Sequence, residues 1–267
     1  MRTLNQKDIK ALIGNHESYR GDCYDCGGAN SLSISCDQGT LKWMCFKAHC
    51  KNKGSGNVKR TSEEITNAIL GRQKKVDSDI RFDVPHYFTS VYSSDRAVKF
   101  FTRYHALPLS EQGRIKLRYD PKQNRAVFLV CRKGEIVDAT GRALDANVVP
   151  KWYRYNGSGQ SFILNHPNPS TPIVVVEDIP SACVCSHEYS AIALMGTSMS
   201  DHDLKDLMGY SKVIVALDPD AYSKGISIAR RLSPFTDARA VLIPDDIKYF
   251  KPTEVKGMLD DRAKISS

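Results

Sequence analysis

Two aspartates follow a run of apolar residues in the last third of the chain. The run, at residues 213–217, leads directly into Asp218-Pro219-Asp220. An unbroken stretch of Val, Ile, Ala and Leu that ends at a proline predicts a strand buried on both faces, as in parallel sheets. Glu177 ends a similar run at residues 173–176. Open α/β sheets bind ligands at the carboxyl ends of their strands, so we expect these carboxylates to meet in one crevice and hold a hard cation such as Mg²⁺.

A second group of residues has the spacing of a metal site. A C-x2-C pair and a C-x4-C pair are separated by eighteen residues. This pattern suits a tetrahedral zinc ion, because thiolates are soft ligands that Zn²⁺ prefers. The predicted ligands are Cys23, Cys26, Cys45 and Cys50. His49 beside Cys50 is an alternative fourth ligand, and we expect Cys36 to be a spare thiol.

Two short strands must position the cysteines. Residues 31–35 alternate polar and apolar side chains, residues 41–44 look like the returning strand, and residues 37–39 form the turn. A unit this small has too little core to fold alone, so the metal is expected to hold a zinc ribbon together over residues 1–57. Trp43 and Phe46 lie among lysines and either stack on single-stranded bases or pack the ribbon.

The carboxylates require a different scaffold. Apolar strand candidates alternate with helix candidates from residue 171 onward, which predicts a parallel, doubly wound sheet. The strands are expected at residues 172–177, 191–195, 212–217 and 240–243, and the helices at 180–188, 200–208, 224–232 and 252–259.

The middle of the chain is mixed and basic. A linker at residues 58–80 includes a helix at 61–73, and a basic α+β subdomain is expected at 81–170. That subdomain contains a helix at 94–104, ended by residues 105–108, and a β-meander at 125–130 and 134–138. The stripe of cations across the meander resembles the footprint of a phosphate backbone, and the nucleotide- or template-binding candidates are Arg114, Arg118, Arg125, Arg142 and Lys151. Arg142 and Lys151 are expected in loops beside Gly or Pro.

Charge and hydropathy limit the function classes. The 267 residues carry a formal net charge of +8, which favours a polyanionic partner such as nucleic acid. No apolar run reaches the roughly 20 residues that span a bilayer, so we expect a cytoplasmic protein without a membrane partner. Clustered cysteines in a reducing compartment favour metal binding over disulfides.

The order of these motifs resembles a known family. Glu177 after the first strand, Gly196-Thr197 after the second, Asp218-x-Asp220 after the third and the acids of Asp245-Asp246 after the fourth are similar to a TOPRIM domain. Together with the four-cysteine ribbon and the basic segment, they resemble DnaG-like DNA primases of the small bacteriophage or bacterial type. One departure is Ser181, which stands where many members of the family carry an acid. The chain has no G-x-x-x-x-G-K-[ST] loop, so no fused helicase is expected.

The resemblance implies a reaction. It implies synthesis of short RNA primers from ribonucleoside triphosphates on single-stranded DNA, which is a DNA-directed RNA polymerase activity. The reaction would be a two-metal nucleotidyl transfer, and the catalytic domain would be a TOPRIM domain at residues 171–262. Glu177, Asp218 and Asp220 are the implied catalytic residues. Asp218 and Asp220 bind Mg²⁺ or Mn²⁺ together with Asp245 and Asp246, and Glu177 either binds the metal as well or acts as a general base. Lys224 joins the triphosphate-binding cations. A separate replicative helicase and a phage-infected bacterial cell are the implied partner and setting.

Other protein classes share parts of the pattern. Phosphatases of the haloacid dehalogenase type need Thr or Ser soon after the second Asp, but Ala221-Tyr222 follows here. A topoisomerase needs a large strand-passage domain with a nucleophilic tyrosine. A recombination mediator, which binds DNA without chemistry, combines a zinc site with a TOPRIM fold and is the alternative function. Its zinc site adjoins the TOPRIM domain, whereas here a long segment separates the two.

Overall fold

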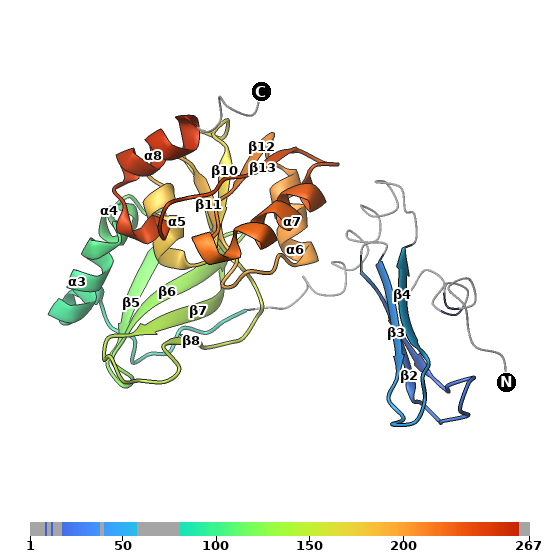
Figure 1. Cartoon of the computed structure of the whole chain (residues 1–267). Coiled ribbons are helices and arrows are strands. Elements are labelled where there is room, and N and C mark those ends of the chain that lie inside the picture. The colour runs from blue at the N-terminus through green and yellow to red at the C-terminus, as the bar shows by residue number, and fades with distance from the viewer. Residues whose placement is uncertain (1–8, 10–11, 13–17, 38–39, 58–80, 262–267) are drawn as a thin grey trace. The chain divides into compact units, whose positions relative to one another are not determined.

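The computed structural model of the chain describes residues 9, 12, 18–37, 40–57 and 81–261. The chain divides into two compact units, Met1–Ala68 and Ile69–Ser267 (Figure 1). The linker predicted at 58–80, with its helix at 61–73, lies outside the described residues, and so does most of the turn predicted at 37–39.

The first unit is a four-stranded antiparallel sheet with the order β1-β2-β3-β4. Its strands are β1 (Ser18–Gly21), β2 (Leu32–Asp37), β3 (Thr40–Cys45) and β4 (Lys53–Asn57). The predicted hairpin is confirmed, because β2 and β3 pair in register from Leu32 opposite Cys45 onward. Alternation places Leu32 and Ile34 on one side of β2, where they are fully buried with Leu41.

Trp43 lies against the neighbouring strand of this sheet. It is opposite Gly54 of β4, and a Cβ atom on Gly54 would be 2.4 Å from the indole Cζ2. Only a glycine leaves room for the ring there. The indole therefore covers the backbone of β4 and packs against the small core of the unit.

The second unit begins with an antiparallel meander in the order β5-β6-β7-β8. Its strands are β5 (Lys116–Asp120), β6 (Arg125–Arg132), β7 (Glu135–Ala143) and β8 (Trp152–Arg154). The predicted meander is confirmed, with β5 and β8 added at its edges. Successive residues of β6 are buried on opposite faces: Phe128 belongs to the main core, and Val127 and Leu129 belong to a smaller core beneath the sheet.

Two helices precede the meander, together with the short helix η1 (Val91–Ser93). The predicted helix is confirmed as α3 (Asp95–Arg103), which is capped by the Ser94 side chain. The helix ends before residues 105–108, as predicted, and a second helix that the sequence did not predict, α4 (Ala106–Glu111), starts within them. Pro108 lies in the first turn of α4, where a missing backbone N–H leaves no hydrogen bond unmade.

The second sheet is mixed, with the order β13-β12-β10-β11-β9. Its strands are β9 (Phe162–Leu164), β10 (Ile173–Val176), β11 (Ser190–Ala193), β12 (Lys212–Val215) and β13 (Asp237–Ala240). Strands β10 to β13 are mutually parallel, as predicted, and β9 pairs with β11 in the antiparallel direction. The strand predicted at residues 240–243 is shifted, because pairing runs from Asp237 to Ala240 and the buried Val241 and Ile243 follow it.

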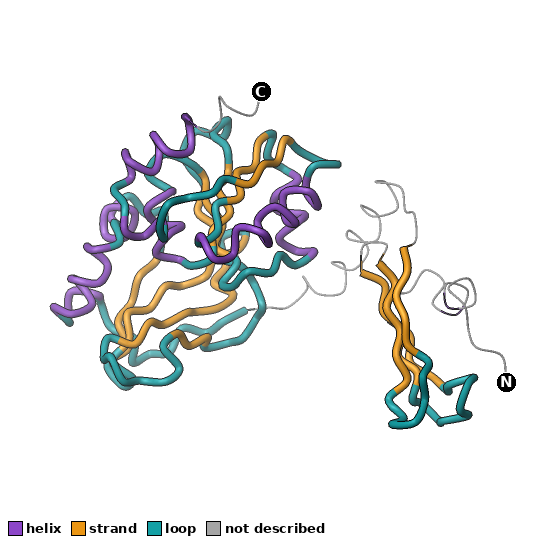
Figure 2. The backbone as a smooth tube through the Cα atoms, viewed as in Figure 1, coloured by secondary structure: helices purple, strands orange, loops and turns teal. Residues whose placement is uncertain are grey.

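Helices cover both faces of this sheet. They are α5 (Ile179–Cys185), α6 (Asp201–Met208), α7 (Tyr222–Leu232) and α8 (Pro252–Asp261), with short helices η2 (Pro219–Ala221) and η3 (Ile247–Tyr249). Helices α5 and α8 lie on one face, and α6 and α7 lie on the other (Figures 1 and 2). Both faces of β10 are therefore buried, which explains its continuous apolar sequence. None of the described helices is long and apolar enough to cross a bilayer.

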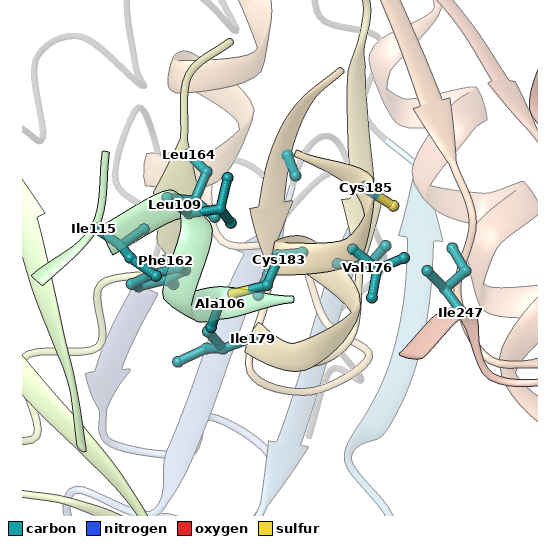
Figure 3. Close-up of a cluster of buried hydrophobic side chains, with 14 of the residues drawn as sticks. Ala106, Leu109, Ile115, Phe162, Leu164, Val176, Ile179, Cys183, Cys185 and Ile247 are labelled. Atoms are coloured by element: carbon teal, nitrogen blue, oxygen red, sulfur yellow. The ribbon is translucent and has the colours of Figure 1, made fainter. Parts of the chain in front are cut away.

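One core joins the meander and the second sheet. It contains Phe128 of the meander, Leu109 of α4, Leu164 of β9 and Cys183 of α5. Figure 3 shows Leu109, Leu164 and Cys183 within this cluster. Because β9 precedes residue 170 and still belongs to the second sheet, the middle and C-terminal segments of the chain are packed as one unit.

Candidate active site and metal centre

Glu177 and Asp218 meet at the carboxyl edge of the parallel sheet. Strands β10 and β12 pair with Val175 opposite Val215, so the chain leaves both strands at the same edge. The backbone N–H of Asp218 donates to Glu177 Oε1 at 3.3 Å. The short helix η2 begins directly after Asp218, and Asp220 lies within it and is exposed. The structure therefore brings the three predicted carboxylates to one place.

Two further acids and a lysine complete this group. The Nζ atom of Lys248, in η3, lies 2.7 Å from Asp246 Oδ2, 3.0 Å from Asp178 Oδ2 and 3.9 Å from Asp218 Oδ2. We call Glu177, Asp178, Asp218, Asp220 and Asp246 the acid cluster. Of the two acids after β13 that the sequence left equivalent, Asp246 joins the cluster. Asp245 is exposed and accepts a hydrogen bond from the Asp246 N–H.

Burial and charge repulsion raise the proton affinity of two members of the cluster, Glu177 and Asp218. Burial raises the pKa of Asp218 to about 7, opposed by the Lys248 ammonium and assisted by the neighbouring carboxylates. Burial also raises the pKa of Glu177, and the charges of Asp220, Asp178 and Asp246 add to this effect. Burial by itself would lower the pKa of Lys248, but its contacts with Asp246 and Asp178 raise it overall. Such carboxylates are under-neutralised and suited to a cation.

Ser181 occupies the position where the resemblance leads one to expect an acid. It is buried in the first turn of α5, and its backbone N–H donates to Asp178 Oδ1 at 2.9 Å. Asp178 is thus the N-cap of α5 and at the same time a partner of Lys248. The sequence left the role of Asp178 open and did not single out Lys248. The sequence signal for Lys248 was its place two residues after Asp246, which follows the strand predicted at residues 240–243.

The donor set of the cluster fits a divalent cation in chemistry. Carboxylate oxygens are the ligands that Mg²⁺ and Mn²⁺ prefer, and the raised pKa values of Glu177 and Asp218 indicate that their negative charge is only partly neutralised. Within the described ranges, however, the grouping of ligand atoms that all lie within 4.8 Å of one another is the cysteine quartet. In the acid cluster, Asp178, Asp218 and Asp246 instead surround Lys248.

Lys224 lies close to the acidic edge of the sheet. Its Nζ atom donates to Thr197 Oγ1 at 2.8 Å, which joins the start of α7 to the segment after β11. The first turn of α7 has no side-chain cap on its backbone N–H groups. A helix N-terminus with a lysine beside it is suited to bind a phosphate.

Arg142 and Lys151 have different settings. Arg142 was predicted in a loop, but it lies in strand β7, with its guanidinium 5.4 Å from the ring of Trp152. Burial lowers its pKa, and the charge of Asp178 is one of the groups that act in the opposite direction. Arg142 is therefore within electrostatic range of the acid cluster. Lys151 is exposed before β8.

The other predicted cations divide into exposed and structural groups. Arg118 is exposed on β5. Arg125 is only 2% exposed, and its guanidinium donates to the carbonyl oxygens of Gly141, Pro150 and Lys151. Arg114 donates to the carbonyls of Asn165 and Ser186, the latter at the C-terminus of α5. The stripe predicted from the sequence thus includes two arginines whose donors already bind the protein backbone.

The four predicted zinc ligands converge in the first unit. The Sγ atoms of Cys23, Cys26, Cys45 and Cys50 all lie within 4.8 Å of one another. Two of the separations, Cys23 to Cys50 and Cys26 to Cys45, are 3.7 Å. A tetrahedral zinc with Zn–S bonds of about 2.3 Å requires S···S distances of about 3.8 Å, so this group can hold one zinc ion.

Hydrogen bonds to Cys45 and Cys23 favour the charged form of these two sulfurs. The Ser31 hydroxyl, 3.4 Å from Cys45 Sγ, and the Lys47 N–H together lower the pKa of Cys45 to about 6. Asn52 Nδ2 donates to Cys23 Sγ at 3.5 Å. His49 is exposed, and Cys36 is buried in the core away from the quartet. The structure therefore places Cys50, rather than His49, with the other three thiols.

Aromatic residues of the first unit differ in exposure. Trp43 is partly buried against the core, whereas Phe46 is 54% exposed, with the Arg20 guanidinium 5.1 Å from its ring centroid. An exposed ring beside a cation suits base stacking better than a packed indole does. Phe46 thus replaces Trp43 as the better-placed aromatic residue.

No family model and no curated protein matches the sequence. Solved structures with a similar fold include DnaG-type primase domains. The zinc binding and RNA polymerase domains of the Aquifex aeolicus primase are 15% identical, with a TM-score of 0.46 over 95% of this chain and 83% of that chain. A DnaG primase catalytic domain bound to ssDNA is 18% identical, with a TM-score of 0.43 over 61% of each chain. The RNA polymerase domain of Mycobacterium tuberculosis DnaG is 14% identical, with a TM-score of 0.40 over 76% of this chain and 82% of that chain.

Proposed function

We propose that the chain is a DNA primase that synthesises short RNA primers on single-stranded DNA at a TOPRIM-type centre. The observation that carries the proposal is the meeting of Glu177 with Asp218 and Asp220 at the carboxyl edge of a doubly wound sheet. The four-thiol site on a separate unit and the basic character of the chain also support it.

The proposed reaction is nucleotidyl transfer between two ribonucleotides. The 3′-hydroxyl oxygen of one nucleotide forms a bond to the α-phosphorus of the next and gives up its proton to solvent. The bond from that phosphorus to the bridging oxygen breaks, releasing pyrophosphate. Glu177, Asp218 and Asp220 would hold Mg²⁺ or Mn²⁺. A divalent cation bound there lowers the pKa of the attacking hydroxyl and neutralises charge on the leaving oxygens.

Cationic groups around the cluster hold the triphosphate in this proposal. Lys224 and the uncapped N-terminus of α7 lie at the same edge of the sheet and bind phosphate oxygens. Arg142 adds positive charge from β7, and Lys151 is exposed for contact with template or nucleotide. Arg114 and Arg125 act differently: they hold the backbone that supports these groups.

In the same proposal the first unit contacts the template. Phe46 and Arg20 offer a stacking ring with a cation, and zinc holds the small sheet that presents them. Loss of zinc then impairs initiation on a template, while the catalytic unit, which has its own core, stays folded.

Template-directed synthesis tests the proposal. The full chain, loaded with zinc, is incubated with short single-stranded DNA, labelled ribonucleotides and Mg²⁺, and the products are sized. We expect oligoribonucleotides complementary to the template. They should be lost with Asp218→Asn and retained with Asp237→Asn, which removes an exposed acid of β13. DNA binding without synthesis would support a recombination mediator instead.

A further inference from the structure

Lys248 lies among acids from three separate segments of the chain. Asp178 follows β10, Asp218 follows β12 and Asp246 follows β13, and the Lys248 Nζ atom is 2.7 to 3.9 Å from a carboxylate oxygen of each. The lysine side chain is only 15% exposed. An ammonium group in this position is a fixed cation inside the acid cluster.

The contacts of Lys248 divide the cluster into two halves. Asp178 has both oxygens engaged, since Oδ1 caps α5 and Oδ2 contacts Lys248. Asp246 Oδ2 makes the shortest contact with the ammonium, at 2.7 Å. In the described part of the chain, Glu177 and Asp220 form no ion pair, and Asp218 is the most distant of the lysine's partners.

This division limits the number of metal ions. A pair of catalytic divalent ions lies about 3.5 to 4 Å apart and needs carboxylates on both sides. Here the oxygens on one side already bind an ammonium, and a divalent ion brought close to that ammonium meets like-charge repulsion. Of the other members, Glu177 and the exposed Asp220 form no ion pair with the ammonium in the described part of the chain, and Asp218 contacts it only at 3.9 Å.

We infer that Lys248 takes the place of a second divalent ion, so that the acid cluster binds one divalent cation per chain, on Glu177, Asp218 and Asp220. In the proposed primase, with which this inference is linked, Lys248 is a positioning residue. It supplies fixed positive charge and holds Asp178 and Asp246 away from the bound ion. The count of bound ions itself is independent of catalysis.

Mn²⁺ binding to the zinc-loaded full chain, followed by electron paramagnetic resonance of free Mn²⁺, gives this count. We expect one Mn²⁺ per wild-type chain, lost with Asp218→Asn. Lys248→Gln should admit a second Mn²⁺ or tighten the first by at least about tenfold, because it removes a charge close to the site. Lys248→Arg should keep the count at one. Lys256→Gln, which breaks an ion pair with Glu188 outside the cluster, is the matched control and should leave binding unchanged.

Several results would overturn the inference. Two Mn²⁺ ions on the wild-type cluster would do so, and so would Lys248→Gln binding with wild-type count and affinity. If Lys248→Gln fails to fold, as judged by thermal unfolding, the wild-type and Lys248→Arg counts decide. Primer synthesis by a chain that binds two ions would refute the inference and leave the proposed function standing. One bound ion without any primer synthesis would support the inference and refute the proposed function.

Discussion

Asp218→Asn should stabilise the protein while it removes activity. Burial raises the pKa of Asp218 from its ordinary value of 3.8 to about 7. The folded state thus binds this proton more tightly than the unfolded state. Between pH 3.8 and 7, stability falls as the pH rises, and above pH 7 the whole cost is present.

The magnitude follows from the size of this shift. At 1.36 kcal/mol per pH unit the cost is at most about 4 kcal/mol, and access of water to the partly exposed carboxylate reduces it to about 1–2 kcal/mol. Asparagine has nearly the same shape and no charge. At pH 8 without Mg²⁺, the variant should therefore melt about 4 °C above wild type, and the difference should vanish near pH 4. Added Mg²⁺ should stabilise wild type and not the variant.

Thermal unfolding followed by tryptophan fluorescence measures the difference in melting temperature. Both proteins carry Trp43→Phe, so that the fluorescence reports only Trp152 of the second unit. Asp237→Asn on β13 is the control. Its melting temperature should not rise above that of wild type between pH 4 and pH 8. A variant less stable than wild type at pH 8, or a difference of equal size at pH 4 and pH 8, would refute the account of the acid cluster.

Three other predictions concern residues outside the acid cluster. Cys50→Ser should lose the zinc ion, measured by a colorimetric chelator after denaturation, whereas His49→Ala should retain it; the reverse result would make His49 the ligand. Arg125→Met should lower the free energy of unfolding by about 2–4 kcal/mol in urea, because three carbonyls lose a buried donor, while the exposed Arg118→Met should change it by less than about 0.5 kcal/mol. Lys224→Met should raise the KM for ribonucleotides about tenfold, equivalent to one charge-assisted hydrogen bond, with an unchanged melting temperature; an unchanged KM would exclude it from the phosphate site.

The sheet that carries the acids could be predicted because its strands are buried on both faces. Strands β10 and β12 have continuous apolar sequences, and the acids at their ends are visible in the chain. Strand β13 was misplaced because Asp237 and Arg239 alternate with alanines at the sheet edge, while the apolar run begins after the pairing ends. Hydrophobicity marks burial, and at this edge burial and pairing do not coincide.

Long-range contacts could not be predicted from local pattern. Lys248 lies seventy positions from Asp178, so nothing near either residue indicates their contact. Arg125 looked like a phosphate ligand within a basic stripe, but its partners include the carbonyl of Pro150, twenty-five positions away. An exposed arginine and a buried one have the same local sequence signal. The cysteine quartet was predictable because its ligands occur as two pairs that are close in sequence, C-x2-C and C-x4-C.

Dinucleotide formation on a single-stranded template tests the central claim most directly. Wild-type chain, template DNA, two complementary ribonucleotides and Mg²⁺ should give a dinucleotide and pyrophosphate, and both products should be absent with Glu177→Gln or without template. Template binding with no pyrophosphate release by wild type, or release that persists in the Glu177→Gln variant, would contradict the account.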